Sequence, residues 1–257
     1  MIPAQFERVL MSILKFYHSG DLGDIIFSLP LIRWKGRGSL ILDASDCKFD
    51  PVVNWASGLL SNTKLNYESC LSISGLLRIQ DYIEDVQIVE GPVDFCDINL
   101  NLFREHIHFN NLAYSHLAIL EDDSQRYFDL TKKPWIQVEP MPLPPGKDVV
   151  IARNLRYQSN HYFWECLPRD VSGRAVFIGS ELEYKVFTYL FPYHEVVYLE
   201  TKSILNLARL IAGAKQFIGN QGLPHALAEA MNIQLTCEAD KNYPAAVFPD
   251  KPSSTYV

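Results

Sequence analysis

A glycine turn that opens a helix is the first place where the sequence suggests chemistry. Residues 217–232 read FIGNQGLPHALAEAMN, in which Gly219 and Gly222 permit close backbone approach and Pro224 suits a first helical turn. The free N–H groups and positive dipole end of this helix would face the turn, which favours a bound phosphate. Glycine turns also precede helices that bind nothing, so this stretch alone leaves both interpretations open.

Asp24 is the second candidate, in the N-terminal sequence HSGDLGDIIFSLPLIR. Residues 13–17, ILKFY, are apolar except for Lys15 and predict a buried strand. Residues 18–23 predict a polar loop, and residues 24–33 have the apolar spacing of a helix. A carboxylate in this position could act as a general base toward a hydroxyl group. It could equally be a helix cap stabilised by the dipole, and the sequence does not separate the two roles.

Two arginines follow a predicted strand at residues 149–152. Arg153 and Arg156 lie in a polar loop, and ligands of parallel α/β sheets bind beyond the carboxyl ends of the strands. Either arginine could stabilise the negative charge of a departing diphosphate, with no metal ion required. The alternative is that both side chains lie on the surface and serve solubility.

The elements that must position these groups alternate regularly after residue 148. The predicted strands cover residues 149–152, 175–178, 195–199 and 217–218, and the predicted helices cover 181–190, 203–214 and 225–231, with a helix or irregular segment near 161–166. This alternation is typical of a parallel sheet with helices on both faces.

A proline-rich segment separates this part from the first half of the chain. Residues 139–147, EPMPLPPGK, contain four prolines and predict a stiff connector. The first half begins with the same strand, loop and helix pattern, so we predict an α/β protein with two Rossmann-like lobes facing across a cleft. The predicted divisions are an acceptor-side lobe at 1–140, with 1–10 as an extension, a linker at 141–147, and a donor lobe at 148–257.

The remaining patterns of the first half are less regular. Strands are predicted at residues 39–42 and 86–89 and a helix at 52–60, and Pro30 is expected to bend the first helix or end it early. Asp43 and Asp46 could form a metal pair, but a capped turn is favoured. The acidic run at 121–123 is typical of a solvated loop, and the tail at 242–257 is expected to pack on the first lobe or to fray.

Composition restricts the function further. The 257 residues are 48% hydrophobic and carry a net charge of −7, which disfavours nucleic acid as a partner and leaves at most a peripheral membrane contact. The five cysteines never form C-x-x-C, which favours free thiols in a reducing compartment. No apolar run approaches the ~20 residues of a membrane span, and the N-terminal residues lack the pattern of a signal peptide. A cytoplasmic protein is expected.

Two motifs together resemble the heptosyltransferase-like glycosyltransferases, glycosyltransferase family 9. One is G-x-L-G-D-x-I-x-x-x-P at residues 20–30, and the other is I-G-x-x-x-x-x-H-x-x-A at residues 218–228, preceded by a helix that ends in small residues. The tryptophan of KKPWIQV, residues 132–138, also looks like the family. The resemblance covers residues 13–33 and 149–235.

The resemblance implies a GT-B fold and transfer of a sugar from a nucleotide-sugar donor to an acceptor hydroxyl, with the catalytic base at Asp24. Together with the loop arguments above, it leads to a set of donor and phosphate-binding candidates: Arg153, Arg156, Gly179, Asn220, Gln221, Gly222, Leu223 and His225. The acceptor-side loop candidates are His18, Ser19, Gly20 and Gly23. No metal and no cofactor is assigned, since the nucleotide sugar is a substrate, and displacement from the far face of the sugar would invert the anomeric centre.

One departure from the family concerns the donor. Family members often have Asp followed by Ser or Thr where this chain has Asn220 and Gln221, which leaves the donor nucleotide open. His225 could serve packing alone, and His18 fits a loop residue better than a catalyst. The acceptor could be a lipopolysaccharide core, another glycan, a small molecule or a modified nucleic-acid base.

Two other functions remain as alternatives. A nucleotide-dependent oxidoreductase or epimerase would have G-x-G-x-x-G after the first strand, whereas Gly20 and Gly23 are spaced G-x-x-G, although Asp43 does follow the second strand. A degenerate nucleotide or glycan binding protein without turnover would keep the cleft and lose the base. Asp24 disfavours this last alternative, and Asn220 keeps it open.

Overall fold

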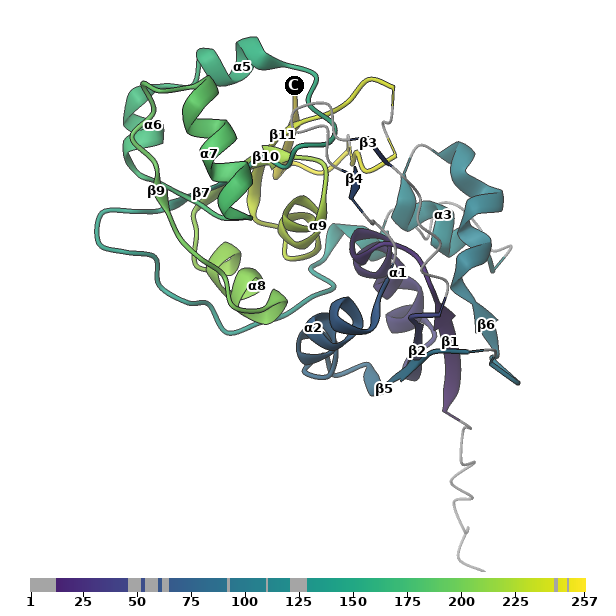
Figure 1. Ribbon diagram of the computed structural model, residues 1–257. Helices are drawn as coiled ribbons and strands as arrows, with labels where there is room; N and C mark the ends of the chain where they lie inside the picture. Colours follow the sequence, from purple (N-terminus) through teal and green to yellow (C-terminus); the bar gives the residue numbers. More distant parts are fainter. Residues whose placement is uncertain are drawn as a thin grey trace, which may run out of the picture.

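The computed structural model describes residues 13–45, 52–53, 60–61, 65–91, 93–109, 111–120, 129–242, 245–248 and 250–257. These residues form two larger sheets, both parallel and flanked by helices, and one small antiparallel pair of strands (Figure 1). The predicted α/β class with two Rossmann-like lobes is therefore confirmed. The extension predicted at residues 1–10 lies outside the described residues.

The first sheet has the strand order β5-β2-β1-β6. Its strands are β1 (Leu14–His18), β2 (Gly38–Asp43), β5 (Ile83–Val89) and β6 (Ile98–Asn99). Its helices are α1 (Leu22–Trp34), α2 (Tyr67–Leu77), the 3-10 segment η1 (Leu100–Phe109) and α3 (Leu112–Ala118). The direction of strand addition reverses between β1 and β6, and in open α/β sheets ligands bind beyond the carboxyl ends at such a reversal.

The second sheet has the order β12-β11-β10-β7-β8-β9. Its strands are β7 (Val149–Ala152), β8 (Ala175–Phe177), β9 (Val197–Tyr198), β10 (Gln216–Asn220), β11 (Gln234–Glu238) and β12 (Ser254–Tyr256). Its helices are α5 (His161–Glu165), α6 (Arg169–Gly173), α7 (Glu181–Leu190), α8 (Ile204–Ala212) and α9 (Leu223–Ala230). In chain order the strands run 3-2-1-4-5-6 from β9 to β12, the Rossmann arrangement, with its reversal between β7 and β10.

The predicted and observed ends of helices and strands agree best where the sequence carries a strong capping signal. Helix α7 covers residues 181–190 as predicted, because Ser180 and Glu183 form a capping box at its start. The helix predicted at 52–60 is wrong at both ends, since β3 (Val52–Val53) and β4 (Leu60–Ser61) are antiparallel strands. Helix α2 and strands β11 and β12 were not predicted.

Pro30 lies inside α1, and the helix continues past it to Trp34, so of the two predicted outcomes, a bend or an early end, the early end is wrong. A proline lacks the N–H that would bond to the carbonyl four residues earlier, which here belongs to Ile26. The indole Nε1–H of the buried Trp135 donates to that Ile26 carbonyl at 3.0 Å. The tryptophan therefore replaces the hydrogen bond that Pro30 removes.

Replacing Trp135 with Phe is expected to lower the free energy of unfolding by about 1–3 kcal/mol, because the buried Ile26 carbonyl loses its donor. In a Pro30→Ala background the same replacement should cost about 1 kcal/mol less, since the introduced alanine brings its own N–H to that carbonyl. Urea unfolding of the four proteins measures both costs. Equal costs in the two backgrounds would contradict this account of Pro30.

The two lobes pack directly on each other through helices. Helix α1 contacts α9, and α2 contacts α8, so a single apolar core extends from the first sheet to one face of the second. The tail adds to this junction: β12 pairs with β11, and the Phe248 ring lies 5.8 Å from the Phe27 ring of α1. The tail thus packs on the first lobe, as one of the two predicted outcomes had it, and also completes the second sheet.

Candidate functional site

The two reversal points of the sheets carry the loops that the sequence analysis singled out. The loop between β1 and α1 contains Asp21 and leads to Asp24 in the first turn of the helix, and the turn between β10 and α9 faces the loop that follows β7. Arg156 of the β7 loop places Nη1 3.9 Å from Oδ2 of Asp21. This ion pair joins the carboxyl ends of the two sheets, which point toward the top of Figure 1.

Asp24 occupies the third position of α1 and Asp21 is the N-cap, so Asp24 is not the N-cap itself, but it does cap the start of the helix as the partner of Asp21 in a capping box. The backbone N–H of Asp21 donates to Oδ2 of Asp24 at 3.3 Å, and Nη2 of Arg104 lies 3.9 Å from the same oxygen. Burial raises the pKa of Asp24 to about 7, the Asp21 carboxylate adds to this rise, and Arg104 opposes it. A carboxyl with a pKa near neutrality suits a general base.

The raised pKa of Asp24 predicts how stability depends on pH. Its folded-state pKa lies above its unfolded value, so its contribution is fully present below the unfolded pKa near 4 and is lost as pH rises through about 7. Asp24→Asn should therefore raise the unfolding free energy at pH 8 by on the order of 2–4 kcal/mol, with little change at pH 4.

Asp148 provides a control of opposite sign. Its hydrogen bond to Lys215, and the nearby Arg174, hold the pKa of Asp148 below its ordinary value, so Asp148→Asn should lower stability at neutral pH. Thermal unfolding of both variants between pH 4 and pH 8 makes the comparison. If Asp24→Asn is less stable than the wild type at pH 8, then Asp24 is not a destabilising buried charge at that pH.

Two buried histidines hold the loop that leads to Asp24. The Gly20 N–H donates to Nδ1 of His18 at 2.8 Å, so the neutral His18 carries its proton on Nε2. That nitrogen lies 3.3 Å from Nε2 of His116, whose Nδ1 is 2.7 Å from the Leu112 carbonyl. Nε2–H of His18 then donates to Nε2 of His116, and Nδ1–H of His116 donates to the Leu112 carbonyl. These hydrogen bonds assign one tautomer to each ring.

Burial keeps this histidine pair neutral. It lowers the pKa of His116 to about 3 and the pKa of His18 well below its ordinary value, with the neighbouring His116 and Arg104 adding to the effect on His18. His18 is therefore a poor proton acceptor near neutral pH. It is the last residue of β1, so its expected place in the loop is wrong, and its Nδ1 positions the loop by accepting the Gly20 N–H.

The other acceptor-side candidates differ in what they contribute. A Cβ atom on Gly20 would lie 2.6 Å from Cε1 of His18 and 2.9 Å from Oδ2 of Asp24, so only glycine fits there. Ser19 exchanges two hydrogen bonds with the Asn101 side chain, which ties the loop to the start of η1, directly after β6. A Cβ atom on Gly23 would meet nothing within 4 Å, so no close approach explains that glycine.

The donor-side turn is held by two asparagines. Asn220 lies at the end of β10 and bonds to the main chain of the β7 loop, while Nδ2 of Asn154 donates to the Gln221 carbonyl. Gly222 caps α9 without a side chain, and a Cβ atom there would lie 2.5 Å from Nδ2 of Asn154. The first N–H groups of α9, beginning at Leu223, have no partners within their own helix.

Arg153 requires a correction. Its side chain is not at the surface, because it is 2% exposed and its Nε and Nη2 donate to the Glu238 carboxylate at 2.9 and 3.1 Å. Nε and Nη2 are thus occupied by Glu238, whereas the buried Nη1 has no hydrogen-bond partner among the described residues. Arg156, whose side chain is partly exposed, is the arginine of this loop that remains available.

His225 and Gly179 are also explained by local structure. His225 is fully buried between Phe27 and Tyr256, and burial lowers its pKa to about 4 although Glu229 opposes the shift. The burial agrees with the packing interpretation of His225, although neither of its ring nitrogens has a hydrogen-bond partner among the described residues. Gly179 follows β8 with φ of 137°, and a Cβ atom there would lie 2.7 Å from the Glu183 carboxylate that caps α7.

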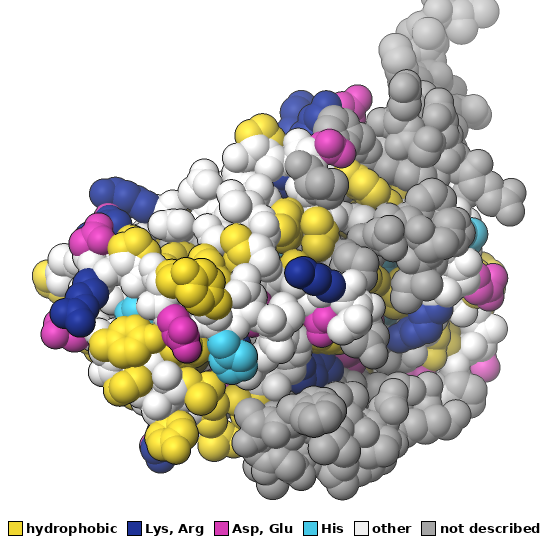
Figure 2. Space-filling model, turned by 90° about the horizontal axis from the view of Figure 1, so that it is seen from above, with side chains coloured by type: hydrophobic (Ala, Val, Ile, Leu, Met, Phe, Trp, Pro, Cys, Tyr) yellow, Lys and Arg dark blue, Asp and Glu magenta, His cyan; other side chains and the backbone are white. Residues whose placement is uncertain are grey.

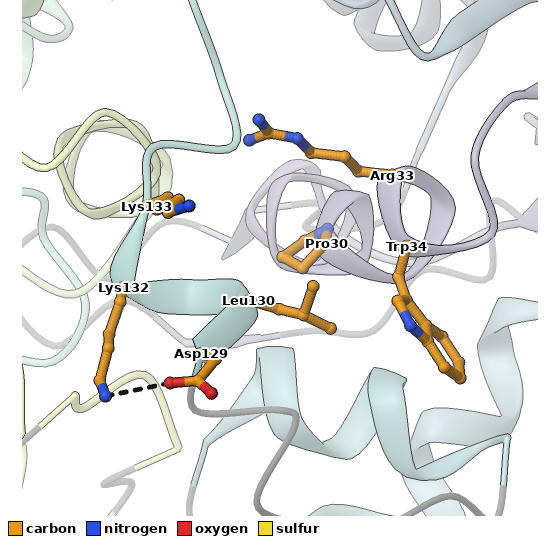
Figure 3. Close-up of a pocket in the computed structure, with 7 residues that line it drawn as sticks. All are labelled: Pro30, Arg33, Trp34, Asp129, Leu130, Lys132 and Lys133. Carbon is orange, nitrogen blue, oxygen red and sulfur yellow. Dashed lines mark hydrogen bonds and ion pairs between the residues drawn. The ribbon is translucent and has the colours of Figure 1, made fainter.

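A cavity of about 730 Å³ lies at the opposite end of α1, roughly 14 Å along the helix from Asp24. Its lining residues are Pro30, Arg33, Trp34, Asp129, Leu130, Lys132 and Lys133 (Figure 3). The basic groups do not converge, because Arg33 donates to the Pro134 carbonyl and Nζ of Lys132 lies 3.1 Å from Asp129. The cavity is therefore separate from the candidate site.

The sequence analysis missed four residues of the site: Asp21, Arg104, His116 and Asn154. Only Asp21 had a local signal, as an acid three residues before Asp24 in the same segment. Asp43 forms the capped turn that was favoured over a metal pair, because its carboxylate accepts the Ser45 N–H at 2.8 Å. Asp46 lies outside the described residues.

Features for other ligand classes are absent from the described part of the chain. Within it, no group of three or more His, Cys, Asp or Glu side chains is placed to hold a metal ion. None of the described helices is long and apolar enough to cross a membrane. On the face seen in Figure 2, described basic and acidic side chains are interspersed.

Comparison with solved structures identifies the fold. A glycosyl transferase family 9 protein from Veillonella parvula aligns over 95% of this chain and 85% of its own, with a TM-score of 0.57 and 9% identity. E. coli ADP-heptose LPS heptosyltransferase II aligns over 95% and 90%, with a TM-score of 0.54 and 10% identity. E. coli heptosyltransferase WaaC, solved with ADP, aligns over 95% and 92%, with a TM-score of 0.52 and 12% identity.

The chain therefore has the GT-B fold of the family 9 heptosyltransferases, and the resemblance seen in the two motifs is confirmed for the fold. No protein-family model matches the sequence, and no curated protein matches it significantly.

Proposed function

We propose that this protein is an inverting, metal-independent glycosyltransferase that moves a sugar from a nucleotide-sugar donor to an acceptor hydroxyl. The observation that carries the proposal is the placement of Asp24 and the α9 N-terminus at the reversal points of two sheets, joined by the pair Asp21 and Arg156. Structural neighbours that are glycosyltransferases, one of them solved with ADP, support this assignment.

In the proposed reaction the acceptor hydroxyl attacks the anomeric carbon while Asp24 takes its proton. The bond from that carbon to the phosphate oxygen breaks, and the nucleoside diphosphate leaves with the bonding electrons. The N–H groups at the start of α9 and the guanidinium of Arg156 stabilise its charge, so positive charge is supplied without a metal ion. A single displacement inverts the anomeric centre.

Each of the two sheets belongs to a lobe that we assign to one substrate. We assign the acceptor to residues 1–140 and the donor to residues 148–257, with the linker at 141–147 and the cleft between the two loops. The acceptor is a glycan or small molecule, nucleic acid is not a partner, and a cytoplasmic location with at most peripheral membrane contact fits the composition.

The test is to incubate the protein with a panel of nucleotide sugars and candidate acceptors and to measure free nucleoside diphosphate. Release that depends on an acceptor, with a new glycoside of inverted configuration detected by NMR, is the expected result. Nucleotide binding without release under any acceptor would favour a binding protein instead.

A further inference from the structure

The side-chain amide of Asn220 makes three hydrogen bonds to the main chain of the loop that follows β7. The residue is 2% exposed at the carboxyl end of β10. Its Nδ2 donates to the Arg156 carbonyl at 2.6 Å and to the Asn154 carbonyl at 3.1 Å, and its Oδ1 accepts the Asn154 N–H at 2.8 Å. All these partners belong to the loop after β7, 64 to 66 positions away in the sequence.

These partners require an amide. The Asn154 N–H can only donate and the Arg156 carbonyl can only accept, so the side chain at 220 must offer one acceptor and one donor. An aspartate would place a carboxylate oxygen 2.6 Å from a carbonyl oxygen, with no proton between them, in a nearly buried position. Asparagine at position 220 thus matches the one donor and one acceptor that this loop requires.

The loop depends on this support. Tyr157 has a φ of 53°, a left-handed conformation that is uncommon for a tyrosine and needs surrounding contacts to persist. The Arg156 N–H donates to Oδ1 of Asn154 at 2.8 Å, so both sides of the Arg156 backbone are fixed by asparagine amides. The Arg156 side chain starts from this fixed point and reaches Asp21 of the other lobe.

We propose that Asn220 is a positioning residue that acts through Arg156: its carboxamide sets the backbone from which the guanidinium meets the diphosphate of the donor. The inference rests on the proposed function for the identity of the ligand. The contact between Asn220 and Arg156 can be tested without any ligand.

The first measurement is hydrogen exchange of residues 153–160 in the full chain. Asn220→Asp should speed exchange of the Arg156 N–H by at least about tenfold after correction for intrinsic rates, because the loop opens more often. Lower pH should reverse the effect, since a protonated carboxyl can donate to one carbonyl. Gln158→Ala is the control, because Gln158 bonds to Asn154 at 2.9 Å but not to Arg156. Unchanged exchange in Asn220→Asp would overturn the proposal.

The second measurement is the affinity for ADP, UDP, GDP and CDP by calorimetry. Asn220→Asp and Arg156→Ala should each weaken the nucleotide that binds best by about tenfold or more, and the double variant should be no weaker than Arg156→Ala alone. Additive losses would show that Asn220 does not act through Arg156 and would also overturn the proposal. A wild-type protein that binds none of the four would refute the proposed function, while the exchange result would still decide whether Asn220 holds the loop.

Discussion

Asp24→Asn is expected to reduce turnover by at least about a hundredfold while donor affinity stays near the wild-type value. The variant keeps an oxygen that can accept the Asp21 N–H, so the start of α1 is preserved. What it loses is the proton acceptor for the attacking hydroxyl. Stability at pH 8 should rise at the same time, as argued above, so activity and stability move in opposite directions.

The pH profile of the wild type provides the second readout. Because the base must be deprotonated, kcat/KM, which reports the free protein, should rise with pH and level off above about 7, the pKa to which burial raises Asp24. Asp21→Asn is the informative companion: removing the neighbouring negative charge should move the rising limb toward lower pH. Near wild-type turnover in Asp24→Asn, measured with a verified donor and acceptor, would assign the base to another residue.

Glu238→Ala is expected to cost about 3–5 kcal/mol of unfolding free energy, the largest loss of stability that we predict. Glu238 is fully buried, and besides the two hydrogen bonds from Arg153 it accepts the N–H groups of Ser159 at 2.7 Å and Asn160 at 2.6 Å and the indole N–H of Trp164 at 2.7 Å. Burial alone would raise the pKa of Glu238, but the bonds and charge of Arg153 outweigh it and hold that pKa below its ordinary value.

The loss arises because removing one partner leaves the buried Arg153 charge uncompensated. Replacing Arg153 and Glu238 together by leucine should recover part of the loss, since no unpaired charge remains. Glu181→Ala is the control, because this exposed carboxylate is paired with Lys185 at the surface and its removal should leave the free energy of unfolding nearly unchanged. Urea unfolding compares the variants, and a cost below about 1 kcal/mol for Glu238→Ala would mean that water reaches Arg153.

Much of the local structure could be predicted from the sequence because its signals lie within a few residues of one another. The capping box of Ser180 and Glu183 fixes the start of α7, and four consecutive apolar residues define β7 where it was expected. The alternation of such elements after residue 148 was sufficient for the Rossmann-like lobe. Asp24 could be singled out because it follows a strand and a glycine loop.

Only the tertiary structure decided which side chains meet. Arg153 is buried because Glu238 lies 85 residues further on, and α1 passes Pro30 because Trp135 reaches a carbonyl 109 residues away. His18 meets His116 across 98 residues, and its burial in this setting, with His116 adding to the effect, lowers its pKa and keeps it neutral. Strand order brings these partners together, and a sequence pattern reports only the period and capping of its own segment. The sequence by itself thus determined most of the elements and the candidate base, whereas strand order within the second sheet determined which of the two arginines is buried.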